Sequence, residues 1–418
     1  MRNYPKRSAK MHLEQKSWQK TEYILSVLLL VSLAGLMLFL TYHQAVSALT
    51  DGYNYKSDIL AYMKEAQGID SGYSFPYPIM FWFIAFLNLF LPIEWASAVV
   101  VTVFQCASFV LLRYYFQKYL HKVCPDLKAG WQQVLTSMAA FGILFYSMIF
   151  VYNHYFPGTR FYYLGVFTPN PFHNATYVAS RPFAIAATFM FADLLEQYEE
   201  KFEVKKSFAF SGILLLATMT KPSFTIVFCG AAGLIMLLRM FKRKFRNFKN
   251  TVLLGCMFIP TFVDLLYQFG GVFTGQDSKG QDAGIGFRLF RVWGEYCDNY
   301  PVAIGLLIFF PIVVLLFQYR KMVTNTLYRF GWQLYGMGLA MFILLYEKGF
   351  RVADANFSWG YMLGAFFLVM CSLMVLLEDT ARAEKHSWKL LIQWGAFGVH
   401  FACGIFYFGM ILLGGFYY

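Results

Sequence analysis

The acidic side chain of Asp58 is a candidate for chemistry, because it follows the first long apolar segment of a chain that has few charges. Residues 57–67 have the apolar spacing of a short helix, which Ser57 would cap at its N-terminus. Tyr62 then lies one turn beyond Asp58 on the same face. In one interpretation the carboxylate only stabilises the helix dipole. In the other it is a general base at the membrane surface, where the hydroxyl of an acceptor can reach it.

A second polar stretch, TPNPFHNATYVASRPFA at residues 168–184, comes just before another apolar segment. Its prolines keep the backbone irregular, and irregular polar backbone is tolerated at membrane depth where it lines a cavity. We therefore expect His173, Asn174 and Arg181 to line such a cavity, although residues of these types also suit a capped surface loop. His173 is a weak candidate for a metal ligand, since no second histidine or carboxylate follows at i+3 or i+4.

Lys221, in the sequence MTKPSF, interrupts a long apolar stretch, and we expect a tight helical hairpin whose turn carries this lysine. A lysine costs about 2.5–3.5 kcal/mol at the middle of a membrane, and less near its surface. Its ammonium group either extends to the outer surface or pairs with an anionic ligand. Because Pro222 suits the first turn of the next helix, Lys221 would lie at a helix N-terminus, where phosphate groups bind readily.

The segment EKGFRVADANFSWG, residues 347–360, gathers charged and polar side chains. Glu347 and Arg351 have the i, i+4 spacing of an ion pair. In one interpretation the loop neutralises itself, since exposed pairs of this kind are common and weak. In the other, Arg351 contacts an anionic ligand, and Glu347, Asn356 or Trp359 contacts the polar part of that ligand.

The composition is that of a membrane protein rather than a soluble one. The chain has 418 residues, of which 58% are hydrophobic and only 14% are charged, whereas a soluble domain carries about 25% charged residues. The net charge of +12 comes from basic residues between apolar segments, so it favours topology control and anionic lipid headgroups over nucleic acid. The seven cysteines have no C-x-x-C spacing, and they predict neither a zinc site nor a disulfide framework.

Apolar segments of about 20 residues predict about eleven membrane spans, and hence an all-α bundle that forms a single integral membrane domain over residues 1–418. Residues 79–91 are apolar but short and flanked by prolines, so we expect an interfacial helix there. His400 lies inside the last apolar segment, where an ionisable side chain usually faces the bundle interior, and a neutral histidine in the core is the alternative. The expected spans are residues 21–43, 95–116, 133–152, 180–198, 207–220, 222–238, 251–268, 301–318, 327–346, 358–377 and 389–413.

The distribution of basic residues predicts an orientation for this bundle. With the N-terminus in the cytoplasm and residues 79–91 at the interface, about 25 of the 35 lysines and arginines fall inside, as the positive-inside rule requires. The first outside loop, residues 44–94, would then contain juxtamembrane helices. The long Gly-rich loop 269–300 is a candidate lid, and its end at 287–296 is expected to form an amphipathic interfacial helix.

The layout of the chain resembles the GT-C superfamily of membrane glycosyltransferases, which use lipid-phosphate-linked sugars. The resemblance rests on an N-terminal span, the acid and tyrosine of DILAYMKEA, the aromatic and proline residues of SFPYPIMFW (74–82), and a short apolar helix. It implies that Asp58 is the base of the first outside loop and that basic residues near the outer face hold the donor phosphate. The first outside loop has no D-x-D or acidic pair, so the sequence does not predict for this chain the metal dependence that some members of the superfamily have. Taken together with the polar segments described above, the predicted binding residues are Tyr62, Tyr77, His173, Asn174, Arg181, Lys221, Glu347, Arg351, Asn356 and His400.

We therefore expect an enzyme that moves one sugar from a polyprenyl-phosphate donor to a glycan, protein or lipid acceptor at the outer membrane face, with inversion of the anomeric centre. No cofactor is required for such a transfer, and no nucleic acid takes part. A bacterial cell membrane is the expected location. The alternatives are a transporter or flippase for lipid-linked or amphiphilic substrates, a polysaccharide polymerase or ligase, and a structural membrane protein without chemistry.

Overall fold

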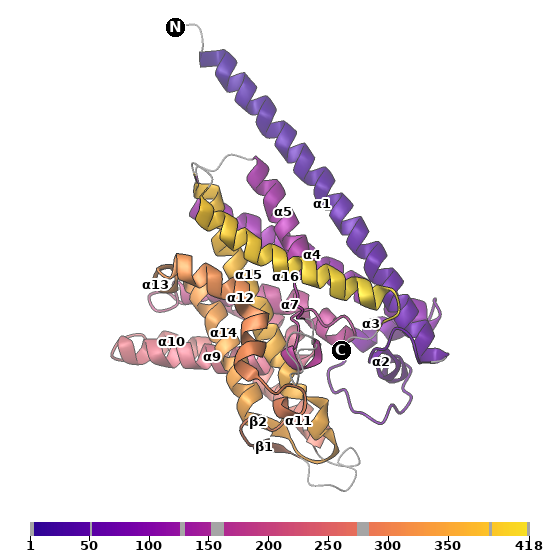
Figure 1. The fold of residues 1–418 in the computed structure, drawn as a ribbon. Helices are drawn as coiled ribbons and strands as arrows, with labels where there is room; N and C mark the ends of the chain where they lie inside the picture. Colours follow the sequence, from indigo (N-terminus) through magenta and orange to yellow (C-terminus); the bar gives the residue numbers. More distant parts are fainter. Residues whose placement is uncertain are drawn as a thin grey trace.

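The protein is a helical bundle in which long helices pack in different directions and are joined by short elements (Figure 1). Helix α1 runs along the outside of the bundle, and its N-terminal part extends beyond the other helices. The computed structural model describes residues 4–50, 52–125, 130–151, 163–273, 284–383 and 387–415.

Within the described ranges, seven helices are long and apolar enough to cross a membrane. The count becomes eight if α10 and α11, which meet at a bend of 45°, cross as one broken span. The protein is therefore a multi-pass integral membrane protein, as its composition predicted. The seven helices are α1 (Tyr4–Leu49), α4 (Ile93–Val123), α7 (Ala175–Leu195), α9 (Pro222–Lys242), α12 (Tyr300–Gln318), α15 (Asn356–Arg382) and α16 (Trp388–Leu412).

The number of spans expected from the sequence, about eleven, is not confirmed. Each remaining expected span falls on a helix, but α5 has only 13 residues and α8 only 15. At about 1.5 Å per residue these helices are shorter than the hydrocarbon layer of about 30 Å. Helix α14, with 19 residues, is long enough but not apolar enough to be counted with the seven. These elements are α5 (Trp131–Ile143), α8 (Val204–Thr218), α10 (Phe248–Cys256), α11 (Ile259–Phe273) and α14 (Thr326–Leu344).

Short elements at the ends of the bundle include one pair of strands that the sequence analysis did not predict. Residues 285–287 pair antiparallel with residues 345–347, and Gly286 lies opposite Tyr346. The amphipathic helix expected at 287–296 is therefore wrong, because Trp293 is fully buried and its indole Nε1 donates to the Gly165 carbonyl at 2.6 Å. The short elements are α2 (Ile59–Ala66), α3 (Ile79–Asn88), α6 (Tyr163–Val166), α13 (Lys321–Thr324), β1 (Ile285–Phe287), β2 (Leu345–Glu347), and the 3-10 helices η3 (Trp293–Glu295) and η4 (Gly349–Asp354).

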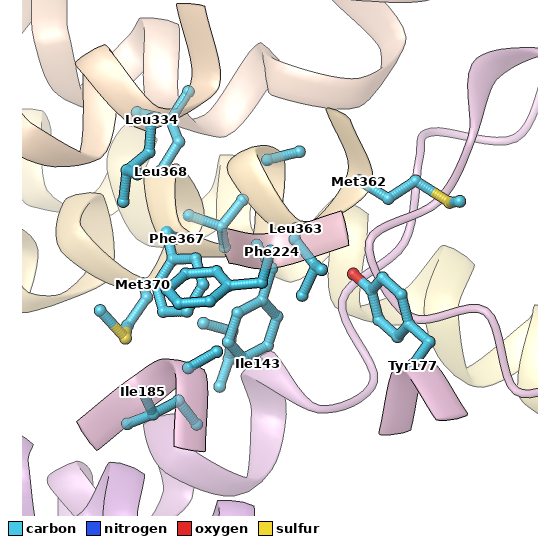
Figure 2. Packing of buried hydrophobic residues seen from close by; sticks show 14 of the residues in the cluster. Ile143, Tyr177, Ile185, Phe224, Leu334, Met362, Leu363, Phe367, Leu368 and Met370 are labelled. Atoms are coloured by element: carbon cyan, nitrogen blue, oxygen red, sulfur yellow. The ribbon is translucent and has the colours of Figure 1, made fainter. Parts of the chain in front are cut away.

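Helix α15 forms the centre of the core, and its most apolar stretch is completely covered by other helices. Figure 2 shows Leu363 and Phe367 of α15 packed near Phe224 of α9. Helix α14 approaches α15 closely, since a Cβ atom at Gly364 would lie 2.9 Å from the Leu334 carbonyl oxygen. A Cβ atom at Gly338 would lie equally close to backbone atoms of α15. Small residues permit this backbone contact between membrane helices.

Five elements meet at one end of the bundle, and they position the polar residues singled out by the sequence. They are α2, the segment before α3, the N-terminus of α7, the turn between α8 and α9, and the N-terminus of α15. The predicted helical hairpin is present, since α8 ends at Thr218 and α9 begins at Pro222, with Lys221 in the turn. Helix α3 has 10 residues and is therefore too short to span a membrane.

Candidate functional site

A cavity of about 530 Å³ opens among these elements. This volume is within the range of small-molecule sites. The cavity joins segments far apart in the sequence, which the predicted topology had placed on the same side of the membrane. The predicted site residues on its wall are Asp58, Tyr62, Tyr77, His173, Asn174, Lys221, Arg351 and Asn356.

Asn174 organises the polar floor of the cavity. Its Oδ1 caps α7 by accepting a hydrogen bond from the Tyr177 backbone N–H at 2.9 Å. Asparagine is a preferred N-cap residue for this reason. With Oδ1 so engaged, the amide Nδ2 donates to Asp58 Oδ2 and to the Tyr62 hydroxyl, each at 2.7 Å. The start of α7 therefore fixes the orientation of the Asp58 carboxylate.

Asp58 itself is half-buried at the start of α2, and its backbone N–H donates to the His173 carbonyl at 3.1 Å. The Tyr62 hydroxyl lies 3.5 Å from Asp58 Oδ2, on the same helix face as predicted. Burial, together with the Asp58 carboxylate, holds the pKa of Tyr62 well above its usual value. The Tyr62 phenol therefore keeps its proton. It lies beside the Asp58 carboxylate, which Asn174 at the start of α7 also contacts.

Lys221 is a buried cation without a carboxylate ion-pair partner among the described residues. Only 5% of the residue is exposed. Its Nζ donates to Thr176 Oγ1 at 2.9 Å and to Asn174 Oδ1 at 3.3 Å, and lies 4.8 Å from the centre of the Trp359 ring. Burial lowers the pKa of Lys221 to about 7, an effect that Asp58 opposes and Arg351 strengthens. Neutral partners leave the ammonium charge available to an anionic ligand.

The predicted ion pair of the 347–360 segment is present at the edge of the cavity. Arg351 Nε lies 3.3 Å from Glu347 Oε2, and the same carboxylate oxygen accepts from Asn356 Nδ2 at 2.8 Å. Burial raises the pKa of Glu347, while Arg351 and Asn356 oppose that rise. Ala355 has a left-handed backbone (φ 52°, ψ 36°), an uncommon conformation for a residue with a Cβ. This turn aims Asn356 and the first turn of α15 at the cavity.

A second, apolar cavity of about 390 Å³ adjoins the polar one. The residues that line both cavities are Tyr77, Lys221, Arg351, Asn356 and Trp359. Its walls come largely from α9 and α11, and Glu347 belongs to this wall rather than to the polar cavity. Leu266, one of its lining residues, is 72% exposed on the outside of the bundle. Because lipid surrounds such a surface in a membrane protein, we call this cavity the lateral groove. Its apolar lining includes Ile226, Val227, Phe262, Leu265, Leu266, Val272, Met341 and Phe357.

Arg181 is not brought to this site. The residue is fully buried inside α7, where Nη1 donates to Asn170 Oδ1 at 2.8 Å and the guanidinium lies over the Tyr177 and Phe366 rings. It lines neither cavity. The sequence placed Arg181 just before a span, but α7 begins at Ala175 and carries the residue into the core. We leave Arg181 out of the proposed site.

His400 is likewise remote from the cavity and fits the alternative of a core histidine. Its Nδ1 lies 2.6 Å from the Ser147 carbonyl, and its Nε2 accepts from the Phe310 backbone N–H at 3.3 Å. That N–H needs a partner because α12 is kinked at Ile308, before Pro311. The imidazole thus completes the hydrogen bonds of a broken helix.

Several residues of the site, one behind the cavity wall and three on it, were absent from the predicted binding set. Thr176, two residues after the α7 cap, accepts a hydrogen bond from Lys221. In the sequence, only its position two residues after the candidate Asn174 pointed to it. The aromatic rings of Phe75, Tyr163 and Tyr407 also line the cavity. Tyr407 comes from an apolar helix with no local signal, so only the three-dimensional arrangement identifies it. In the described part of the chain, no three histidine, cysteine or carboxylate side chains are arranged to hold a metal ion.

No protein-family model matches the chain, and a comparison with curated proteins finds no match either. Function is therefore inferred from the chemistry of the two adjoining cavities.

Proposed function

We propose that the protein is a membrane glycosyltransferase that transfers a sugar from a polyprenyl-phosphate donor to an acceptor at the extracytoplasmic membrane face. One observation carries the proposal. Lys221, which is buried and has no carboxylate ion-pair partner among the described residues, lies at the junction of a polar cavity and a lipid-facing apolar groove. A polyprenyl-phosphate sugar has three matching parts in the same order, namely an apolar chain, an anionic phosphate and a polar sugar. The resemblance of the chain's layout to GT-C glycosyltransferases agrees with this assignment.

In this proposal the prenyl chain occupies the apolar part of the lateral groove, and the phosphate contacts Lys221 and Arg351. The sugar lies near Asn356 and Trp359, which line both cavities, and near the Glu347 carboxylate to which Asn356 donates. Its apolar ring face suits the Trp359 indole, and its hydroxyl groups suit the amide and carboxylate. The acceptor enters the polar cavity beside Asp58 and Tyr62, which line that cavity but not the groove.

The chemical step is a single displacement at the anomeric carbon. Asp58 takes the proton of the acceptor hydroxyl, and the acceptor oxygen forms a bond to the anomeric carbon as the carbon–oxygen bond to the phosphate breaks. The electron pair of that bond leaves with the polyprenyl phosphate, and the anomeric centre is inverted. Lys221 stabilises the negative charge that grows on the leaving phosphate. Asn174 holds Asp58 and Lys221 in one hydrogen-bond network, so base and phosphate site keep a fixed relation. The step requires no cofactor.

The membrane orientation belongs to the proposal as well. The cavity residues lie at the end of the bundle that the positive-inside rule assigns to the outside. The basic cluster of residues 239–249 begins in the last turn of α9, and Lys221 precedes the first turn of the same helix. A cytoplasmic N-terminus and a bacterial cell membrane complete the proposed location.

A transporter or flippase for lipid-linked substrates is the second candidate, and the buried Arg181 favours it. An ionisable residue inside a span often marks a transport path, and Arg181 Nε and Nη2 have no partner among the described residues. Transport would move a fluorescent polyprenyl-phosphate sugar between leaflets of proteoliposomes without forming a new glycosidic product. Such movement, unaffected by replacement of Asp58, would favour this alternative.

The direct test is a transfer assay on the purified chain with a panel of radiolabelled polyprenyl-phosphate sugars and an acceptor extract from membranes. Asp58→Asn should reduce turnover by about 10²–10⁴-fold, the usual contribution of a general base. Asp70→Asn is the matched control, because Asp70 lies in the same loop, is exposed and only accepts from the Gly72 N–H. Normal turnover by Asp58→Asn would remove Asp58 from the base role. The absence of transfer with every donor would reject the proposed reaction.

A further inference from the structure

A separate cavity of about 420 Å³ lies at the other end of the bundle. It is bounded by the last turns of α4, α7 and α15 and by the start of α14. Helix α7 has 21 residues and begins at the Asp58 site, so about 32 Å of helix separates the two cavities. This distance matches the hydrocarbon thickness of about 30 Å. The second cavity therefore lies at the level of the headgroups of the opposite leaflet.

The cavity contains opposite charges in two facing rows. Helix α4 contributes Lys118 and Lys122, which are four residues apart, and α7 contributes Asp193 and Glu196, which are three apart. Such spacings place each pair on one helix face. The Lys118 and Asp193 side chains are 3.0 Å apart, and Lys122 and Glu196 are 2.5 Å apart. All four side chains are about half exposed, and exposed pairs contribute only about 0–1 kcal/mol. A ligand can therefore replace them without a large loss of stability.

The floor of the cavity holds a buried carboxylate, Glu378, which is only 2% exposed. Its Oε1 contacts Lys321 and lies 2.9 Å from Arg382 Nη2, and its Oε2 accepts from the Tyr119 hydroxyl at 2.7 Å. Two cations thus share one carboxylate, which leaves positive charge at the floor. The C-terminal ends of α4, α7 and α15 carry partial negative charge and offset it. The cavity is consequently balanced in charge rather than strongly basic.

We propose that this cavity binds a phosphoethanolamine group, that is, a phosphate joined by two carbons to a primary ammonium. A purely anionic ligand would satisfy the lysines but leave Asp193 and Glu196 without their partners and bring its own negative charge close to theirs, which is unfavourable. A dipolar ion satisfies both rows, with its phosphate on Lys118 and Lys122 and its ammonium on Asp193 and Glu196. A choline group carries no N–H and cannot donate to the carboxylates. The cavity lies between membrane helices at the headgroup level and carries both signs of charge, so phosphatidylethanolamine is the lipid that carries this chemistry.

The test measures lipid binding to the purified full chain in detergent by native mass spectrometry. The probes are phosphatidylethanolamine, phosphatidylglycerol and phosphatidylcholine, each with the same acyl chains. Lys118→Gln with Lys122→Gln should weaken binding of the first two lipids by about 30-fold, which corresponds to about 1 kcal/mol per removed charge. The control pair is Lys201→Gln with Lys206→Gln, since these lysines are ion-paired to Glu203 outside the cavity. The control should bind like the unaltered chain.

Removal of the acids gives a test that misfolding cannot imitate. Asp193→Asn with Glu196→Gln should weaken phosphatidylethanolamine binding and strengthen phosphatidylglycerol binding, so the preference between the two lipids reverses. A misfolded chain would lose both lipids. The proposal is wrong if the unaltered chain binds all three lipids equally, or if the acid variant keeps the original preference. Millimolar phosphoethanolamine forms a further arm: displacement of the lipid shows that the headgroup suffices, and retention shows that the acyl chains contribute.

Discussion

Replacing Lys221 by methionine should make the ligand-free protein more stable while abolishing binding of the donor phosphate. Methionine has a similar length but no charge, and Lys221 is 5% exposed with only neutral hydrogen-bond partners. Burial lowers its pKa from 10.5 to about 7. At about 1.4 kcal/mol per pKa unit, the protonated lysine costs the fold roughly 5 kcal/mol. The two hydrogen bonds lost on substitution are worth about 1 kcal/mol each, so the variant gains about 3 kcal/mol at pH 6.5.

The sign of the pH dependence follows from the same pKa. The unfolded chain keeps the lysine proton up to about pH 10, whereas the folded chain releases it near pH 7. Between these values the unfolded state binds more protons, so the free energy of unfolding rises with pH. The advantage of Lys221→Met should therefore shrink steadily from pH 7 and disappear before pH 10.

The assay is thermal unfolding in detergent between pH 6 and pH 10, comparing the unaltered chain with Lys221→Met. Lys205→Met serves as the control, because Lys205 is exposed at the start of α8 and should show no such convergence. Added polyprenyl phosphate should stabilise the unaltered chain at pH 6.5 and leave Lys221→Met unchanged. A difference between the two proteins that is constant with pH, or that favours the lysine at pH 6.5, would refute the account of Lys221 as a buried cation without a carboxylate ion-pair partner among the described residues.

Two other substitutions test the scaffold of the site. Asn174→Ala should lower the free energy of unfolding by about 1 kcal/mol through loss of the α7 cap, and it should also reduce transfer because Asp58 loses its orienting donor; denaturation and initial-rate measurements separate these effects, and unchanged turnover would contradict the positioning role. Gly364→Ala should destabilise the bundle by about 1–3 kcal/mol, since the added Cβ would lie 2.9 Å from the Leu334 carbonyl. Gly305→Ala, where a Cβ meets open space, is the matched control in the same unfolding assay, and equal melting temperatures for the two variants would contradict the packing argument.

The sequence was informative where a local signal decided the outcome. Thr220, Lys221 and Pro222 interrupt an apolar stretch, and the helical hairpin turns there with Lys221 before the first turn of α9. Asn174 has the residue type of an N-cap and caps α7. In both cases backbone chemistry acts within a few residues, so neighbouring residue types are enough to predict the structure.

The sequence was misleading where the outcome depended on the face of a helix or on distant packing. Arg181 and His400 are polar residues in apolar surroundings, and hydropathy alone does not tell whether such a residue faces a cavity or another helix. His400 accepts a hydrogen bond from a backbone N–H that the kink in α12 leaves without a helical partner, and that N–H lies 90 residues earlier in the chain. The end of the 269–300 loop was expected at the membrane surface, but Trp293 is buried and its indole N–H donates to the Gly165 carbonyl. The span count was not confirmed because the lengths of α5 and α8 depend on where the chain breaks, which apolar composition does not show.

The backbone contact between α14 and α15 has a mechanical consequence. Gly338 and Gly364 bring the two helices together along more than one turn, so neither helix can slide without the other. Helix α15 starts beside the polar cavity and finishes at Arg382 in the cavity at the other end of the bundle. The two helices therefore form one rigid unit across the bilayer. We expect a displacement of α15 along its axis at one membrane face to displace its other end as well.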